Sequence, residues 1–216
     1  MNCYGEQLSQ AAESDGGTDE YARMALRMKP EPEDATSENA DRSRLEVIFP
    51  PEQIAARLDE LAAEIAALKL THLLVVAVLK GSFVFAADLI RALHRAGLEP
   101  EVDFLTLSSY RKSRTSSGKV EILRDLDLDV SGRNVLIVDD VLDSGRTLAF
   151  AKDLLSARGA SSLRTCVLLD KTVQRAVSVV ADYRAFECPP VFVVGYGMDV
   201  AHRFRELLFV GRVIND

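Results

Sequence analysis

A run of seven apolar residues, Leu73–Leu79, is the feature that most constrains how this chain folds. A strand buried on both faces of a sheet has this pattern, because both alternating sets of side chains must leave water. Two similar runs follow at 134–138 and 163–169, and helical spacing of apolar residues occurs between and before them at 83–95 and 146–157. Strands that alternate with helices predict an α/β fold, in which helices flank a mainly parallel central sheet.

The same patterns predict further elements. A strand is expected at 45–49, and after Pro51 a helix is expected whose apolar residues recur at steps of three or four up to Leu68. Residues 108–119 are polar and basic, which predicts a mobile loop that closes over a site. The remaining expected strands cover 101–107, 120–123, 191–194 and 207–213, and a turn is expected at 139–145.

The charge of the chain is concentrated near its N-terminal end. The formal net charge is −7, and residues 1–42 account for −6 of it, with ten acidic and four basic residues. This segment buries too little apolar surface to offset the entropy lost on ordering. We therefore expect an acidic, disordered extension at 1–42 and one folded domain at 43–216. The acidic balance argues against a nucleic-acid partner, because phosphates need a basic surface.

Cysteine usage and hydropathy indicate the compartment. The cysteines are Cys3, Cys166 and Cys188, and they form no CxxC pair and no Cys/His cluster of the kind that binds zinc. No apolar run reaches the roughly 18 residues of a membrane span. The N-terminal residues include no apolar signal segment. These features predict a cytoplasmic protein that has no membrane partner.

The segment from Val135 to Thr147 carries the chemical signal. A buried strand leads to Asp139 and Asp140, and a short turn then precedes a helix. Ligands bind at the carboxyl ends of parallel strands, and the N–H groups at a helix N-terminus suit a phosphate. Carboxylates instead suit the hydroxyls of a diol, or Mg²⁺. The segment therefore predicts a site for a phosphorylated sugar.

A simpler interpretation of the same segment is a capped helix. Asp143 or Ser144 would then be the N-cap, and Asp139 and Asp140 would only be solvated. Three acidic residues together with a Ser-Gly-Arg-Thr turn favour the ligand site over this interpretation. The GxxxxGK[ST] pattern of a P-loop and the glycine fingerprint of dinucleotide-binding proteins do not occur in the sequence.

The segment 135–147 resembles the phosphoribosyl-pyrophosphate (PRPP) motif of the type I phosphoribosyltransferases. Five further segments resemble the hypoxanthine-guanine phosphoribosyltransferases within that family, in the same order, and the resemblance covers 45–216. It implies the type I fold, with a small hood region and a mobile active-site loop. The five segments are 78–81, 109–110, 168–171, 192–199 and 204–207.

The resemblance implies a role for each residue of the PRPP motif. Asp139 and Asp140 match the acidic pair that holds the ribose hydroxyls, and Asp143 matches the proposed general base near N7 of the purine. The 5-phosphate would lie in a loop made of Asp143, Ser144, Gly145, Arg146 and Thr147.

Residues outside the motif acquire roles in the same way. The residues that match the pyrophosphate contacts of the family are Lys80, Gly81, Ser109, Tyr110 and Arg205. Those that match its purine contacts are Lys171, Phe192, Val193 and Asp199, where Lys171 donates to a 6-oxo group. The metal is Mg²⁺, with Asp139, Asp140 and Asp199 as its acidic residues.

The resemblance implies purine salvage, in which the phosphoribosyl group of PRPP passes to N9 of a 6-oxopurine and pyrophosphate leaves. The expected partners are PRPP and the purine base, and the expected assembly is a homodimer or homotetramer. The preference among hypoxanthine, guanine and xanthine stays open, because all three bases have a 6-oxo group. A regulator on the same fold that senses PRPP or nucleotides is the alternative of another class.

Overall fold

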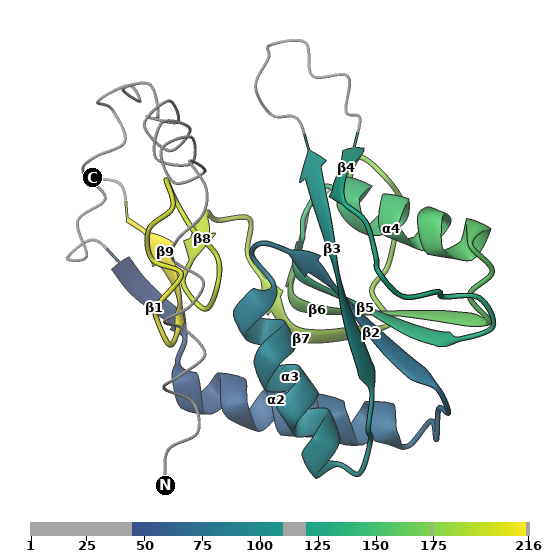
Figure 1. Cartoon of the computed structure of the whole chain (residues 1–216). Coiled ribbons are helices and arrows are strands. Elements are labelled where there is room, and N and C mark those ends of the chain that lie inside the picture. The colour runs from purple at the N-terminus through teal and green to yellow at the C-terminus, as the bar shows by residue number, and fades with distance from the viewer. Residues whose placement is uncertain (1–44, 110–119, 174, 215–216) are drawn as a thin grey trace, which may run out of the picture. The chain divides into compact units, whose positions relative to one another are not determined.

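The computed structural model of the chain describes residues 45–109, 120–173 and 175–214 (Figure 1). The expected extension at 1–42 and Tyr110 lie outside these residues. None of the helices in the described ranges combines the length and the apolar character that a membrane crossing requires.

A six-stranded sheet forms the centre of the folded unit, with strand order β4-β3-β2-β5-β6-β7. All neighbouring strands run parallel except β3 and β4, which are antiparallel. The expectation of a mainly parallel sheet is confirmed. The strands are β2 (Leu73–Leu79), β3 (Glu101–Ser109), β4 (Val120–Arg124), β5 (Asn134–Leu142), β6 (Ser162–Lys171) and β7 (Tyr183–Cys188).

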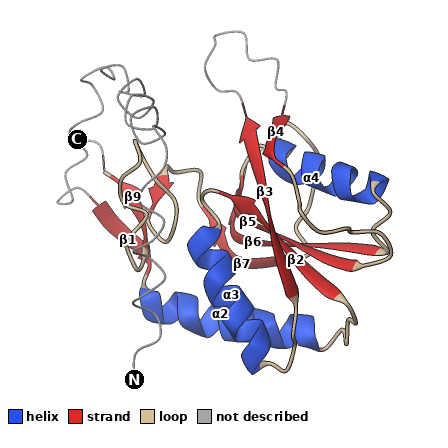
Figure 2. Ribbon diagram, in the orientation of Figure 1, coloured by secondary structure: helices blue, strands red, loops and turns tan. Residues whose placement is uncertain are grey.

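Helices cover both faces of this sheet (Figure 2). α2 (Pro51–Ala66) and α3 (Phe83–Arg95) pack on one face, and α4 (Arg146–Ala157) packs on the other. Alternate residues of β2 enter the two cores: Val75 lies in the first, and Val76 lies in the second. Both side chains are fully buried, which explains the continuous apolar run.

A separate three-stranded sheet, with order β1-β9-β8, forms the hood. Its strands are β1 (Leu45–Phe49), β8 (Val193–Val194) and β9 (Val210–Val213). β9 lies between the other two and pairs with both in the antiparallel direction. The expected small hood is therefore confirmed, although β8 and β9 are shorter than the sequence pattern predicts.

The structure corrects several predicted boundaries. β5 continues to Leu142, so Asp139 and Asp140 lie on a strand and not in a turn. β3 continues to Ser109, where a loop was expected from 108. α2 ends at Ala66, which leaves Leu68 beyond the helix and 41% exposed. The sequence pattern did not predict β7, because this edge strand mixes exposed Arg184 and Glu187 with its buried residues.

The strand order places β2 beside β5 at the point where the direction of winding reverses. The chain continues from β2 to β3 toward one edge, and from β5 through β6 to β7 toward the other. Open parallel sheets bind their ligands in the crevice at such a point, outside the carboxyl ends of the strands. The segments after β2 and β5 are therefore brought together.

Candidate functional site

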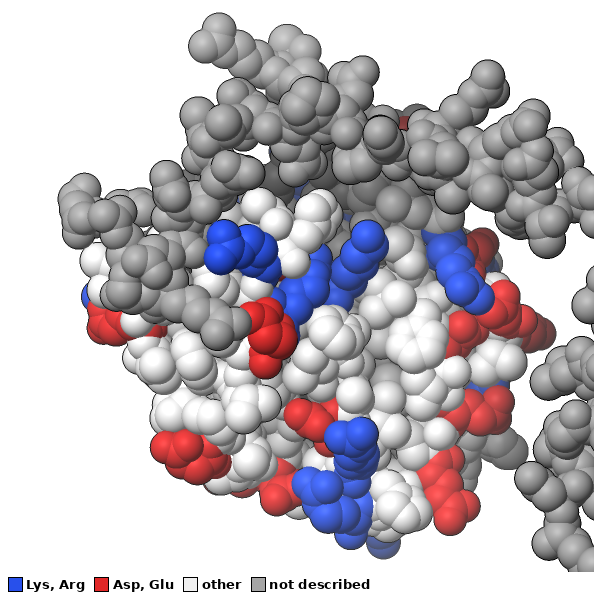
Figure 3. All heavy atoms as spheres, turned by 60° about the vertical axis from the view of Figure 1, so that its left-hand side comes forward, with Lys and Arg blue, Asp and Glu red and all other residues white. Residues whose placement is uncertain are grey.

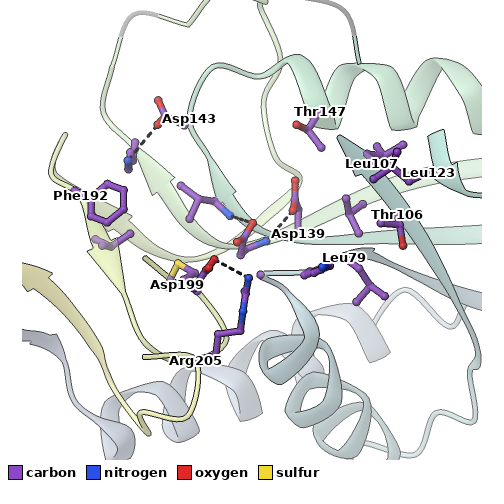
Figure 4. A pocket seen from close by; sticks show the side chains of 18 residues that line it. Leu79, Thr106, Leu107, Leu123, Asp139, Asp143, Thr147, Phe192, Asp199 and Arg205 are labelled. Atoms are coloured by element: carbon purple, nitrogen blue, oxygen red, sulfur yellow. Dashed lines mark hydrogen bonds and ion pairs between the residues drawn. The ribbon is translucent and has the colours of Figure 1, made fainter. Parts of the chain in front are cut away.

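A cleft of about 500 Å³ lies at this end of the sheet (Figure 4). The residues that line it come from the carboxyl ends of β2, β5 and β6, from the loops after β2 and β5, from β3, β4 and the start of α4, and from the hood. The lining residues are Val78, Leu79, Lys80, Gly81, Thr106, Leu107, Leu123, Asp139, Asp140, Val141, Asp143, Thr147, Lys171, Phe192, Val193, Met198, Asp199 and Arg205.

Asp139 and Asp140 form the floor of the cleft. Asp139 is buried, with 6% of its surface exposed, and its Oδ1 accepts a 3.0 Å hydrogen bond from the Asp140 N–H. Burial, and then repulsion by the Asp140 carboxylate, raises the pKa of Asp139 well above its usual range. Burial also raises the pKa of Asp140. Two adjacent carboxylates, one buried and one half-buried, suit hydroxyl donors or a hard cation.

The loop after β5 leads directly into α4. Gly145 is the N-cap of α4 at φ 80°, so the interpretation in which Asp143 or Ser144 is the N-cap is wrong. A Cβ at Gly145 would lie 2.7 Å from the Val177 carbonyl oxygen, so this position requires glycine. Of residues 143–147, Asp143 and Thr147 line the cleft, whereas Ser144 and Gly145 form the turn and Arg146 begins α4.

Lys171 reaches the same loop from the end of β6. Its Nζ donates a 3.1 Å hydrogen bond to Asp143 Oδ2, and its side chain is 13% exposed. A cation and an anion therefore stand side by side at the cleft wall (Figure 4). Such a pair presents a hydrogen-bond donor next to a hydrogen-bond acceptor.

Phe192 and Val193 lie where the chain enters the hood. Phe192 precedes β8 and is 53% exposed, although its side chain lines the cleft. Val193 begins β8 and is buried. An exposed aromatic ring on a cleft wall leaves one face free to stack on a planar ligand.

Lys80 and Arg205 supply positive charge at the opposite wall. The peptide bond between Leu79 and Lys80 is cis. Arg205 Nη2 lies 2.7 Å from Asp199 Oδ1, and its Nη1 donates a 2.6 Å hydrogen bond to the Gly197 carbonyl oxygen. These contacts hold the Arg205 guanidinium in the cleft, where it favours an anionic ligand.

Two glycines allow the wall segments to pack closely. A Cβ at Gly81 would lie 1.7 Å from Asp140 Oδ2, and a Cβ at Gly197 would lie 2.4 Å from the Gly81 carbonyl oxygen. Gly197 also has φ 99°, which favours glycine. The loop after β2 is thus held between the floor of the cleft and the hood.

Known proteins resemble this chain in both sequence and fold. Residues 46–201 match the family model "Phosphoribosyl transferase domain". The chain is 43% identical over 173 residues to "Hypoxanthine phosphoribosyltransferase" of Escherichia coli K12, a match that covers 79% of this chain and 96% of that relative. The chain belongs to the hypoxanthine-guanine phosphoribosyltransferase family. A Bacillus subtilis relative, "Hypoxanthine-guanine phosphoribosyltransferase", is 42% identical over 76% of this chain and 91% of its own.

Solved structures of the family have the same fold. A Bacillus anthracis hypoxanthine-guanine phosphoribosyltransferase superposes with a TM-score of 0.72 at 40% identity, covering 78% of this chain and 98% of its own. A ternary substrates complex of a Trypanosoma cruzi hypoxanthine phosphoribosyltransferase mutant gives a TM-score of 0.74 at 37% identity, covering 80% and 97%. The predicted family and fold are therefore confirmed, and this chain is a phosphoribosyltransferase.

The cleft of this family member contains most of the residues predicted for it. Tyr110 lies outside the described residues, and the structure describes no side chain for Ser109, so their assignment stays a prediction. Three lining residues had no signal in the sequence: Thr106, Leu107 and Leu123. They are strand residues whose position at the cleft depends on sheet register, which one sequence does not reveal.

Proposed function

We propose that this protein transfers the 5-phosphoribosyl group of PRPP to N9 of hypoxanthine or guanine, which gives IMP or GMP and pyrophosphate. The proposal rests on one observation: three groups of residues with different chemistry line the same cleft. The acidic floor fits a diol, the loop before α4 fits a phosphate, and the Lys171–Asp143 pair fits a purine edge.

PRPP fits the cleft through its two charged ends. The 5-phosphate would lie on the 143–147 loop, at the N-terminus of α4, where Thr147 contributes a hydroxyl donor. The ribose hydroxyls would donate to Asp139 and Asp140. The pyrophosphate would then face Lys80 and Arg205, whose positive charges stabilise the leaving group.

The purine fits the opposite side of the cleft. A 6-oxopurine has an acceptor at O6 and, in one tautomer, a donor at the neighbouring N7–H, which match Lys171 Nζ and the Asp143 carboxylate. Adenine has a donor at its 6-amino group, which Lys171 would oppose. Phe192 would stack on the base, and the Val193 backbone would contact its edge.

The transfer exchanges one bond for another. The bond from ribose C1 to the pyrophosphate oxygen breaks, and a bond from C1 to N9 forms. Asp143 accepts the N7 proton as N9 attacks, which keeps the product purine neutral. This step rests on the observed proximity of Asp143 to Lys171.

The acidic residues of the cleft also fit Mg²⁺, because carboxylate oxygens are the ligands that this ion prefers. Within the described ranges no three His, Cys, Asp or Glu residues form a metal-binding group. Mg²⁺ is typically held by one or two carboxylates together with substrate phosphates, so this arrangement suits it. Asp139, Asp140 and Asp199 are the residues that would hold it. When bound, Mg²⁺ offsets the negative charge of the departing pyrophosphate.

A steady-state assay with Mg²⁺, PRPP and four bases tests the proposal. We expect turnover of hypoxanthine and guanine and none of adenine, and the rate with xanthine measures the remaining selectivity. A preference for xanthine over both other oxopurines would replace the proposed substrates. Binding of PRPP without turnover of any 6-oxopurine would favour a PRPP-sensing regulator.

We also propose that the protein is cytoplasmic and forms a homodimer or homotetramer. A second groove supports association: it is lined by residues of α2, α3 and the hood, and it includes Ile54, Leu58 and Leu208. Leu208 is 73% exposed. The hood side of the molecule shows an uncharged area between groups of charged side chains (Figure 3). Light scattering coupled to size exclusion gives the mass of the assembly, and a monomer would contradict the proposal.

A further inference from the structure

One arginine outside the cleft joins the end of β6, which carries Lys171, to residues 175–179, which pack against the loop before α4. Arg175 Nη2 donates a hydrogen bond to Asp170 Oδ1, and Arg175 Nη1 donates a 2.7 Å hydrogen bond to the Val179 carbonyl oxygen. Asp170 is buried, with 7% of its surface exposed. Removal of one partner from a buried ion pair leaves a poorly compensated charge, so loss of the Arg175 side chain should be costly.

The first end of this connection adjoins the purine side of the cleft. Asp170 immediately precedes Lys171 on β6, and Lys171 lines the cleft. The position of the Asp170 carboxylate therefore fixes the last residues of β6. Through them it sets the direction from which the Lys171 ammonium approaches Asp143.

The second contact of Arg175, at Val179, lies next to the 143–147 loop on which the 5-phosphate would lie. The Val177 N–H donates a 3.2 Å hydrogen bond to the Ser144 carbonyl oxygen. The close approach of Val177 and Val179 to Gly145 continues this contact, because a Cβ there would lie 2.7 Å from the Val177 oxygen and 2.8 Å from Val179 Cγ1. Residues 175–179 thus pack against the 143–147 loop, and the hydrogen bond from Arg175 fixes the position of Val179 in this segment.

We propose that Arg175 is a positioning residue that keeps Lys171 and the 143–147 loop at a fixed distance from each other. The inference rests on the proposed function, and it assigns a role to a residue that does not line the cleft. The planar guanidinium donates from two nitrogens in a fixed geometry to two acceptors that belong to different segments. A lysine ammonium at this position would keep the positive charge but would lack two donor nitrogens in a fixed plane, so it would not replace both contacts.

The test compares four variants with the wild type, in steady-state kinetics with PRPP and hypoxanthine and in thermal unfolding. Arg175→Met and Arg175→Lys are expected to lower kcat/KM by roughly 10- to 100-fold, the effect of a displacement of about 1 Å in an active site. The KM values for PRPP and for hypoxanthine should both rise, because Arg175 contacts the segments behind both the 143–147 loop and Lys171. An unchanged kcat/KM in Arg175→Met would overturn the inference.

Arg184→Met is the matched control. Arg184 Nη1 lies 3.5 Å from Asp170 Oδ2, but its side chain is 50% exposed and also pairs with Glu187. It touches the same carboxylate without reaching the phosphate loop, so we expect kinetics within about twofold of the wild type. A loss equal to that of Arg175→Met would show that removing either cation from Asp170 lowers activity regardless of the link to Val179, which contradicts the proposal.

The double variant Arg175→Met/Asp170→Asn separates positioning from folding. Arg175→Met leaves the buried Asp170 carboxylate with the half-exposed Arg184 as its remaining cationic partner among the described residues, and the second substitution removes that carboxylate charge. The melting temperature of the double variant should therefore recover toward the wild-type value. Its kcat/KM should stay low, because the link to Val179 is still absent. Recovery of both quantities would show a purely structural role. A wild type that turns over no 6-oxopurine would instead contradict the proposed function, so the two failures are distinguishable.

Discussion

The Lys171 ammonium donates a 3.1 Å hydrogen bond to the Asp143 carboxylate, and so joins the end of β6 to the loop after β5. Each group limits what the other does. The carboxylate holds the ammonium in one direction at the cleft wall, and the ammonium occupies one of the acceptor positions of the carboxylate. In the function proposed above, a 6-oxopurine would replace this one contact with two, because O6 would accept from Lys171 while N7–H would donate to Asp143.

Asp143→Asn removes the proposed proton acceptor but keeps the size of the side chain. We expect kcat to fall by roughly 10²- to 10⁴-fold, the usual contribution of a general base. The dissociation constant of PRPP, measured by calorimetry, should change by only a few fold. Asp153→Asn, on the exposed side of α4, is the control and should behave as the wild type. An equal loss of binding and turnover would contradict the role as a base.

Lys171→Met removes the donor to the 6-oxo group. The kcat/KM for hypoxanthine should fall by about 30-fold, which corresponds to the roughly 2 kcal/mol of a hydrogen bond to a charged group. The KM for PRPP should change much less. Lys152→Met on α4 controls for the loss of one positive charge. An unchanged kcat/KM for hypoxanthine would show that Lys171 does not contact the base.

Gly81→Ala places a methyl group where the carboxylate of Asp140 now lies. The loop after β2 must shift, so we expect kcat/KM to fall by about 100-fold, as for a displacement of about 1 Å. Gly97→Ala is the matched control, because Gly97 has φ 89° but a Cβ there would meet no atom within 4 Å. That variant should lose about 1 kcal/mol of stability and keep its kinetics. Similar kinetics in the two variants would contradict the steric argument.

Asp139→Asn should stabilise the ligand-free protein while it abolishes activity. Burial raises the pKa of Asp139, so its stabilising contribution is complete below the unfolded pKa of about 3.9 and is lost as the pH rises through its folded pKa. Asparagine does not ionise and avoids this loss. At pH 7 we expect a melting temperature about 2–4 °C above that of the wild type, the shift that roughly 1 kcal/mol produces.

Thermal unfolding between pH 4 and pH 8 checks this sign. The advantage of the Asp139→Asn variant should be small at pH 4 and should grow as the pH rises. An advantage that shrinks with increasing pH would show that Asp139 is more easily ionised in the folded protein than in the unfolded chain.

Removal of residues 1–42 should leave kcat and KM within about twofold of the full-length values. The family match begins at residue 46, and the described residues that line the cleft all lie beyond residue 77. The isoelectric point should rise, since the segment carries −6 of the net charge of −7. Steady-state kinetics of the two forms provide the check. A large loss of activity would assign the segment a part in catalysis.

The sequence predicted the parts of the fold whose signal is local. The continuous apolar run at Leu73–Leu79 identified β2, and the PRPP motif placed Asp139, Asp140, Asp143 and Thr147 in one cleft, as the structure does. The turn expected at 139–145 was wrong because strand pairing continues beyond the apolar residues. β5 pairs with β6 as far as Leu142, which no pattern within β5 reveals.

Other features depend on contacts between distant segments. Tyr183–Cys188 becomes a strand because it pairs with β6 and because Arg57 of α2 donates to the Arg184 and Ala185 carbonyl oxygens. Arg175 had no signal of its own, since its meaning depends on the burial of Asp170 and on the Val179 carbonyl. Such features can be identified only from the three-dimensional structure, because the residues that create them are far apart in the sequence.

The hood has a consequence for how the protein is made. Its strands β1 and β9 come from opposite ends of the described chain, and Leu45 pairs with Val213. A ribosome that adds residues from the N-terminus completes the six-stranded sheet at Cys188, and only later supplies the strand on which β1 and β8 pair. A prematurely terminated chain that ends between these points therefore has Lys171 and the loop before α4, but lacks the strand that holds β8 and the hood in place. Under the proposed function, stacking of the base on Phe192 thus depends on the last strand to be synthesised.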